Sequence, residues 1–244
     1  MILIFAGKRV GSTLLSHLIS MPERIGYVVA ASDTDESIHS LCEQHNIPCS
    51  IFNGLDIGAL RSVSTRYEWL LDLWSPHILS KEILSLARYR ANLHPSLVPH
   101  ARGADSTAWC IRKELPVGVS ILEMTDVVDA GGLYAQKQLE VEFPASGRQL
   151  HERLQDEMIA FFKQVWPHML AGRITPRPQP AGGSHHRRKE TNEDRNRTAD
   201  AVMTLGEAVR WMLAHDFHPG TTAELEQDGQ RFQLQLTVTK IPAV

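Results

Sequence analysis

Short apolar runs alternate with helical patterns along the first 92 residues, and this alternation limits the fold more than any other feature of the chain. The apolar runs predict strands at 2–6, 27–31, 48–52, 69–74 and 90–94. The segments 12–20, 37–45 and 80–87 between them carry apolar residues at helical spacing. Strands that alternate with helices form a parallel sheet covered on both faces, and such strands read as continuous apolar runs. The sequence therefore predicts an α/β protein with a doubly wound sheet.

Three longer elements follow this region. Two further strands are predicted at 117–124 and 133–141, and a long helix at 147–170. The apolar residues of the helix recur every three or four positions, which is typical of a helix with one face in the core. They are Leu150, Leu154, Met158, Phe161, Phe162 and Val165.

The composition changes at Gly172. Proline and glycine punctuate residues 173–183, which we interpret as a linker or an extended surface arm. Farther on, 205–213 predicts a short helix, and 221–225 with 232–239 predicts a hairpin whose turn holds an Asp-Gly pair. We therefore expect a catalytic domain at 1–172 and, at 173–244, a linker followed by a small helix-plus-hairpin extension that serves the substrate or an oligomer contact.

Charge and cysteine content narrow the class of function. The chain has 25 Lys and Arg against 28 Asp and Glu, a net charge of −3, whereas proteins that hold nucleic acid usually carry a basic excess. No apolar run reaches the ~20 residues of a membrane-spanning helix, and the apolar start lacks the basic region of a signal peptide. The 3 cysteines lack metal-ligand spacing and fit a reducing compartment. We expect a cytoplasmic protein with no nucleic-acid or membrane partner.

Polar residues gather where the strand at 90–94 ends. Asn92 and His94 are two residues apart, so their side chains share one face. Ligands of open α/β sheets bind beyond the carboxyl ends of the strands, and an amide with an imidazole there suits an oxyanion holder and an acid–base group. Asp129, in a glycine-flanked loop, is a candidate to orient the imidazole. Asn-x-His is also a common capping pattern, and Asp before Gly is a common turn.

These two segments together resemble the formyltransferase family that uses 10-formyltetrahydrofolate. That family carries Asn-x-His-Pro-Ser-Leu-Leu-Pro, and residues 92–99 read Asn-Leu-His-Pro-Ser-Leu-Val-Pro. It then carries a Gly-x-Thr-x-His strand leading to Asp-x-Gly, and here the strand from Gly118 leads to Asp129-Ala130-Gly131. The resemblance covers about residues 1–172. It implies a Rossmann-like formyltransferase core and an enzyme that transfers a one-carbon group.

The resemblance also implies roles for three residues. Asn92 would donate a hydrogen bond to the developing oxyanion, and His94 would stabilise that charge and move the proton. Asp129 would place His94 and help to collect the proton of the attacking amine. The family often has a histidine where this chain has Leu122, so an auxiliary imidazole is missing from that strand.

A folate pocket is implied as well. The family buries the pterin ring under the loop after the fourth strand and against the backbone before the catalytic aspartate. The corresponding stretches here are 71–79 and 125–128. The apolar residues among them are also compatible with ordinary core packing. The residues expected to contact the folate are Leu71, Trp74, Ile78, Leu79, Thr125, Val127 and Val128.

Residues 173–244 discriminate among acceptor amines. They contain ten Lys and Arg and nine Asp and Glu, and this nearly even charge is unfavourable for a domain that binds tRNA. The enzymes that formylate glycinamide ribonucleotide lack such a tail. Through 183–189 and Phe217-His218-Pro219-Gly220, the tail resembles that of sugar N-formyltransferases, which act on amino sugars carried on nucleoside diphosphates. Arginines in this region are candidates for the pyrophosphate. Expected substrate contacts are Lys8, Ser12, Arg102, His185, Arg187 and Arg188.

We therefore expect a homodimeric enzyme that formylates an amino-sugar nucleotide without a metal, because His185-His186 has no further ligand at metal spacing. Two alternatives stay open. One is another acceptor amine, such as an amino acid, a peptide precursor or glycinamide ribonucleotide. The other is a non-catalytic nucleotide-binding protein of the same fold. A hydrolase that releases formate would also need similar groups, with water as the nucleophile.

Overall fold

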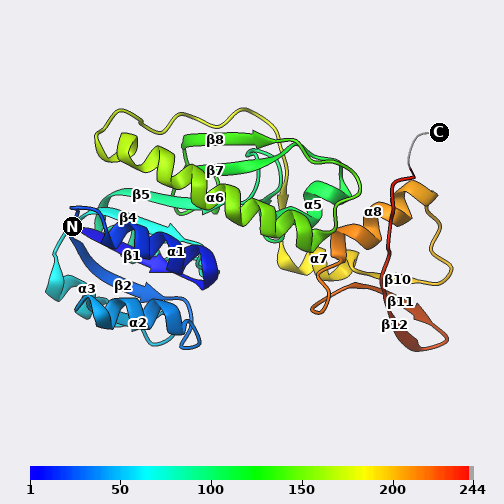
Figure 1. Ribbon diagram of the computed structural model, residues 1–244, viewed down its shortest axis with the longest axis horizontal. Helices are drawn as coiled ribbons and strands as arrows, with labels where there is room; N and C mark the ends of the chain where they lie inside the picture. Colours follow the sequence, from blue (N-terminus) through cyan, green and yellow to red (C-terminus); the bar gives the residue numbers. More distant parts are fainter. Residues whose placement is uncertain (242–244) are drawn as a thin grey trace. The chain divides into compact units, whose positions relative to one another are not determined.

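The computed structural model describes residues 1–241 and contains three sheets (Figure 1). Their strand orders are β3-β2-β1-β4-β5-β7-β8, β10-β11-β12 and β6-β9. The strands are β1 (Ile2–Ala6), β2 (Ile25–Ala30), β3 (Cys49–Ile51), β4 (Tyr67–Leu73), β5 (Ala87–His94), β6 (Arg102–Gly103), β7 (Val117–Glu123), β8 (Leu133–Leu139), β9 (His185–His186), β10 (Asn196–Thr198), β11 (Ala223–Gln227) and β12 (Gln230–Leu234). The helices are α1 (Lys8–Ile19), α2 (Glu36–Gln44), α3 (Ile57–Val63), α4 (Lys81–Leu84), α5 (Ser106–Arg112), α6 (Gly147–Leu170), α7 (Arg188–Asp194) and α8 (Leu205–His215). Along residues 1–241, no helix is both long enough and apolar enough to cross a membrane.

The chain packs as two compact units, which are described separately. Unit 1 comprises Met1–His94, Ser120–Gln136 and Gln155–Gln179. Unit 2 comprises Pro95–Val119, Lys137–Leu154 and the chain from Pro180 onward. Each unit joins segments that are far apart in the sequence. The division into a core at 1–172 and an extension at 173–244 concerns function and stays a prediction.

The sheet of unit 1 confirms the predicted doubly wound α/β fold. β1 runs parallel to β2 and β4, β2 to β3, and β4 to β5, whereas β7 is antiparallel to β5. On one face, Phe5 and Leu70 share a core with Leu60 of α3 and Leu84 of α4. On the other face, Trp166 of α6 meets Trp69 with ring centroids 5.1 Å apart. Helices cover both faces, which explains why these strands read as continuous apolar runs.

The start of α1 lies close to the carboxyl end of β4. α1 begins at Lys8, four residues before the predicted segment. A Cβ on Gly11 would lie 2.8 Å from the carbonyl oxygen of Leu73, so only glycine lets the helix approach the strand this closely. The backbone N–H of Gly7 also donates to that oxygen, at 3.2 Å. These contacts hold α1 at the sheet edge where ligands of such folds bind.

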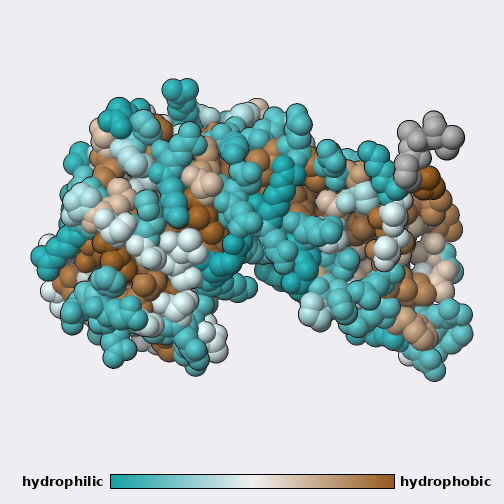
Figure 2. All heavy atoms as spheres, in the orientation of Figure 1, coloured by the Kyte–Doolittle hydropathy of each residue, from teal (hydrophilic) through white to brown (hydrophobic). Residues whose placement is uncertain are grey.

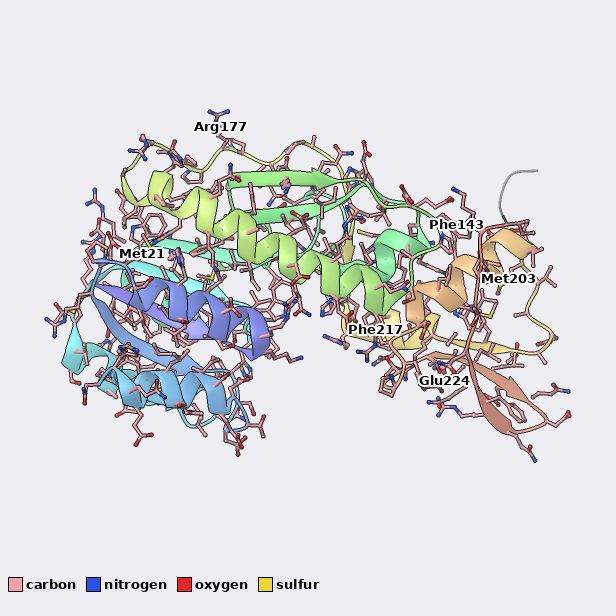
Figure 3. The ribbon with its side chains drawn as sticks, viewed as in Figure 1. Met21, Phe143, Arg177, Met203, Phe217 and Glu224 are labelled. Atoms are coloured by element: carbon pink, nitrogen blue, oxygen red, sulfur yellow. The ribbon has the colours of Figure 1, made fainter. Side chains whose placement is uncertain are left out.

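Unit 2 is built from short helices and strands. Its hairpin turns at Asp228 and Gly229, whose φ angles are 51° and 73°, as the Asp-Gly pair predicted. The second strand of the hairpin is confirmed, but its predicted bounds of 232–239 are wrong: the two-residue turn places Gln227 opposite Gln230, so β12 occupies Gln230–Leu234. Glu224 of β11, labelled in Figure 3, forms an ion pair with Arg195 at 3.2 Å.

Candidate active site

The carboxylate of Asp129 connects the three expected catalytic side chains, all of which lie in unit 1. Asn92 Nδ2 donates to Asp129 Oδ1 at 3.2 Å, and His94 Nδ1 lies 3.5 Å from Asp129 Oδ2. The side chains of His94 and Asp129 are 7% and 6% exposed. Each carboxylate oxygen of Asp129 therefore faces one side chain of β5. Asp129 lies 37 residues after Asn92 in the sequence, so these contacts join its loop to the end of that strand.

The loop that carries Asp129 has a tightly constrained backbone. Asp129 itself has a φ of 52°, in the left-handed region, which is uncommon for residues other than glycine but is adopted by aspartate more readily than by most side chains. A Cβ on Gly131 would lie 1.9 Å from the carbonyl oxygen of Glu123, so this position requires glycine. Gln179 clamps the same turn, because its Nε2 donates to the carbonyl oxygens of Asp129 at 2.7 Å and Gly131 at 2.8 Å.

Sequence reasoning missed Gln179, since it lies in the proline-rich segment interpreted as a linker or arm. The structure shows an arm that runs beside β8. Arg177, labelled at the top of Figure 3, pairs with Leu133 through two backbone hydrogen bonds of 2.6 and 3.0 Å. This pairing brings Gln179 to the Asp129 turn. No periodicity marks such a contact, because it depends on a single amide.

We expect Gln179→Glu to lower kcat by about 10- to 100-fold, because displacing a catalytic group by about 1 Å has effects of this size. The new carboxylate would face two carbonyl oxygens and push the Asp129 turn away. Gln138→Glu, the same change at an exposed position of β8, is the matched control and should keep the wild-type rate. Single-turnover formyl transfer measures both variants. A Gln179→Glu enzyme as fast as the control would show that the clamp has no role.

Two residues flank Asn92 on the neighbouring strands of the sheet. Leu122, which stands where the family often has histidine, is the register partner of Asn92 on β7 and is fully buried. Asp72 is the register partner of Asn92 on β4 and is 8% exposed. The pKa of Asp72 is raised to about 8, chiefly by burial. The charge of Asp129 adds to this rise, and the hydrogen bond from the Ser75 N–H opposes it. An aspartate within the apolar run 69–74 was the available sequence signal for this residue.

The expected folate-contacting residues divide by exposure. Leu71 is fully buried and Leu79 belongs to the core of unit 1. Ile78, Val127 and Val128 expose 76%, 60% and 37% of their surface. Thr125 Oγ1 donates to the carbonyl oxygen of Val127 at 2.9 Å, and Trp74 is half-buried with a φ of 73°. All seven residues stay predicted folate contacts, and the three exposed ones offer apolar surface that a ligand can reach.

The two loops that supply the exposed apolar residues are neighbours. Lys81 Nζ at the start of α4 lies 2.9 Å from Asp126 Oδ2 in the loop before Asp129. Ser80 caps α4 by accepting from the backbone N–H of Ile83, so the segment 74–80 ends at a fixed point. The geometry therefore brings the segment after β4 beside the loop after β7, as the implied pocket requires.

The expected substrate contacts fall into both units. In unit 1, the backbone N–H of Lys8 donates to Asp35 Oδ1 at 2.9 Å, and Ser12 Oγ donates to the carbonyl oxygen of Arg9 at 3.1 Å. In unit 2, Arg102 pairs with His185 across β6 and β9, which brings the first motif beside the tail.

The basic residues of the tail lie at the beginning of α7. Arg187 is exposed and precedes the helix, while Arg188 Nη1 lies 2.8 Å from Asp105 Oδ1 with 70% of its side chain exposed. His186 stacks on Trp109 at a centroid distance of 4.0 Å, so it supports the fold of unit 2. Within the described residues, no three His, Cys, Asp or Glu side chains are grouped to hold a metal. Contact of Arg187 and Arg188 with a pyrophosphate stays a prediction.

Comparison with known proteins identifies the central segment. Residues 75–165 match the family model for formyl transferases. The methionyl-tRNA formyltransferase of Halorhodospira halophila is 32% identical over 119 residues, which are 48% of this chain and 38% of that protein. The chain thus aligns with little more than a third of the length of this curated relative.

Solved structures extend the likeness to the fold of the chain. The sugar N-formyltransferase of Shewanella sp FDAARGOS_354 superposes with a TM-score of 0.84 at 17% identity, over 99% of both chains. The N-formyltransferase of Helicobacter canadensis, in complex with folinic acid and dTDP-3-aminofucose, gives a TM-score of 0.71 at 16% identity, over 88% of this chain and 80% of that one. The expected resemblance to formyltransferases is therefore confirmed, by a family model for residues 75–165 and by the fold.

Proposed function

We propose that this chain, which carries a formyl transferase segment on a formyltransferase fold, transfers a formyl group from 10-formyltetrahydrofolate to the amine of a nucleoside-diphosphate-linked amino sugar. The observation that carries the proposal is the meeting of Asn92, His94 and Asp129 inside the matched segment. An amide donor, an imidazole and a carboxylate in contact can hold an oxyanion and move one proton, which is what acyl transfer to an amine requires.

The geometry supports different roles for Asn92 and His94. Asn92 Nδ2 has two hydrogens; one is donated to Asp129 Oδ1, and the second would stabilise the formyl oxygen when the amine attacks. His94, placed by Asp129, would share that charge and carry the proton. The bond between the amine nitrogen and the formyl carbon forms, and the bond from that carbon to N10 of the folate breaks. The proton lost by the amine ends on N10, leaving tetrahydrofolate and a formamide.

Structural relatives favour an amino-sugar nucleotide as the acceptor. The Shewanella protein is a sugar N-formyltransferase, and the Helicobacter canadensis protein was crystallised with an amino-sugar nucleotide and a folate. The sequence relatives formylate methionyl-tRNA, but residues 173–244 of this chain carry ten basic against nine acidic residues. Binding a polyanion requires a much stronger basic excess, so a sugar nucleotide fits this chain better.

The decisive experiment offers the protein 10-formyltetrahydrofolate with a panel of amino-sugar nucleotides, methionyl-tRNA and glycinamide ribonucleotide, and detects the formylated product by mass spectrometry. We expect product only from amino-sugar nucleotides. Formylation of methionyl-tRNA or of glycinamide ribonucleotide alone would refute the acceptor class, and formate without any formylated amine would indicate a hydrolase. Folinic acid should raise the thermal midpoint, because a ligand that binds only the folded state stabilises it.

We also propose a homodimer in the cytoplasm. Support for the dimer comes from unit 2, where Val202 and Leu205 at the start of α8 are 99% and 81% exposed. Figure 2 shows hydrophobic surface over the start of α8. Exposed apolar patches of this kind are typical of contact surfaces. Light scattering should give about twice the chain mass of 27.3 kDa, and a monomer at micromolar concentration would contradict the proposal.

A further inference from the structure

Asp72 is a buried carboxyl group beside the site that the proposed reaction does not yet use. It follows the apolar residues of β4 and is 8% exposed. Its Oδ1 accepts the backbone N–H of Ser75 at 2.8 Å. On β1 its register partner is Phe5, a core residue. A carboxyl group in such surroundings pays a large desolvation penalty when it is charged.

The groups that face Asp72 add little positive charge. From β5 come Asn92, its register partner, and His94 two residues farther on the same face. The loop after β7 contributes Asp129, whose negative charge raises the pKa of Asp72 further. On α1, which also packs against β4, Lys8 and Arg9 are exposed, and Arg9 Nη1 lies 2.6 Å from Asp156. Burial raises the pKa of Asp72 to about 8, so at neutral pH its carboxyl group carries a proton and can donate.

An acceptor for that proton lies on the adjacent strand. Asn92 Nδ2 donates to Asp129, but Asn92 Oδ1 is buried and has no hydrogen-bond partner in the structure. Side chains of register partners on adjacent parallel strands lie side by side on one face, and Asp72 is the β4 register partner of Asn92. Buried polar atoms are almost always hydrogen-bonded. A protonated Asp72 supplies the missing donor.

We infer that Asp72 is a positioning residue of the site: its protonated carboxyl group donates to Asn92 Oδ1 and thereby holds the Asn92 amide with its N–H group toward Asp129 and the formyl oxygen. This inference rests on the proposed function. When Asp72 loses its proton, it can no longer donate, and a second negative charge stands beside Asp129. Both changes oppose an oxyanion at Asn92, so activity falls as the pH rises past the pKa of Asp72.

Two substitutions separate donation from mere packing. Asp72→Asn keeps the shape, accepts from Ser75 and supplies an N–H donor at every pH, so it should keep kcat within about tenfold of wild type. Asp72→Ala removes the donor, and kcat should fall by about 10²-fold, the effect of losing one oxyanion-hole donor, with both KM values nearly unchanged. The alkaline decline of wild type, centred near pH 8, should be absent from Asp72→Asn.

Glu68→Gln is the matched control. It makes the same carboxyl-to-amide change at an exposed position of β4, where Glu68 pairs with Arg88 at 3.5 Å, and it should retain the wild-type pH profile.

Infrared difference spectroscopy gives a readout that does not need turnover. Wild type and Glu68→Gln at neutral pH should show the carbonyl band of a buried protonated carboxyl group, and Asp72→Asn should lack it. A wild-type enzyme that formylates its amine while Asp72 is ionised at neutral pH, or an Asp72→Asn enzyme that keeps the alkaline decline, would overturn this inference and leave the proposed function intact. A protein that formylates no amine in the panel would overturn both.

Discussion

Asp129→Asn should lower kcat for formyl transfer by about 10³- to 10⁴-fold, the loss that follows when the carboxylate orienting a catalytic imidazole becomes an amide. The reason is local. In the native site both carboxylate oxygens accept, one from Asn92 and the other facing His94. An amide can present only one acceptor, so its N–H group would face either Asn92 Nδ2 or His94 Nδ1. Single-turnover transfer from 10-formyltetrahydrofolate measures the loss.

Asp156→Asn is a matched control for this substitution. It makes the same chemical change on α6, where the side chain of Asp156 is 67% exposed and lies 2.6 Å from Arg9. The control should keep the wild-type rate within about twofold, as surface substitutions away from such sites usually do. Both variants should show the same thermal shift with folinic acid. Comparable rates for Asp129→Asn and wild type would remove Asp129 from the mechanism.

The strands of the core and the Asn92–His94 pair could be predicted because each signal is local. A strand buried on both faces must be apolar along its length, and two residues on one strand at spacing two must share a face. The position of Asp129 beside them followed from a resemblance between motifs. No local rule places a loop 37 residues away against a strand end.

What could not be predicted depends on single long-range contacts. Gln179 reaches the Asp129 turn because Arg177 pairs with Leu133, and neither contact leaves a periodic pattern in a proline-rich segment. The strands β6 and β9 have two residues each, too few for any alternation to be visible. Asp72 was visible as a charge within an apolar strand, but its meaning depends on Asn92 being its register partner. Register between strands is set by the packing of the whole sheet.

In unit 2 one carboxylate with a side chain only 14% exposed holds three elements together. Asp194 at the end of α7 accepts from Arg112 of α5 at 3.1 Å, from His215 of α8 at 3.0 Å and from Arg197 of β10. Its backbone carbonyl oxygen also accepts from Trp211 Nε1 at 2.7 Å. Burial alone would raise the pKa of Asp194, but the hydrogen bonds and charges of His215, Arg112 and Arg197 outweigh it and hold the pKa well below the usual range. The charged form of Asp194 is therefore the form that stabilises the fold.

Asp194→Asn should lower the free energy of unfolding by about 3 kcal/mol, the size of effect expected when one member of a buried ionic cluster is removed. The side chains of Arg112 and Arg197 are only 16% and 24% exposed, so they would keep charges without their partner. Because the pKa of Asp194 is lower in the folded state than its unfolded value of about 3.9, the stabilisation is complete above that value and is lost as the pH falls toward the folded pKa. Urea titrations at pH 7 and pH 3 should therefore show a large difference in the free energy of unfolding between wild type and variant at pH 7, and a smaller one at pH 3.

Glu193→Gln is the control, a carboxyl-to-amide change at the neighbouring residue, which is 64% exposed and pairs with Lys189 at 3.6 Å. It should leave the urea midpoint unchanged. Equal midpoints for the two variants would mean that the cluster contributes nothing to the stability of this unit.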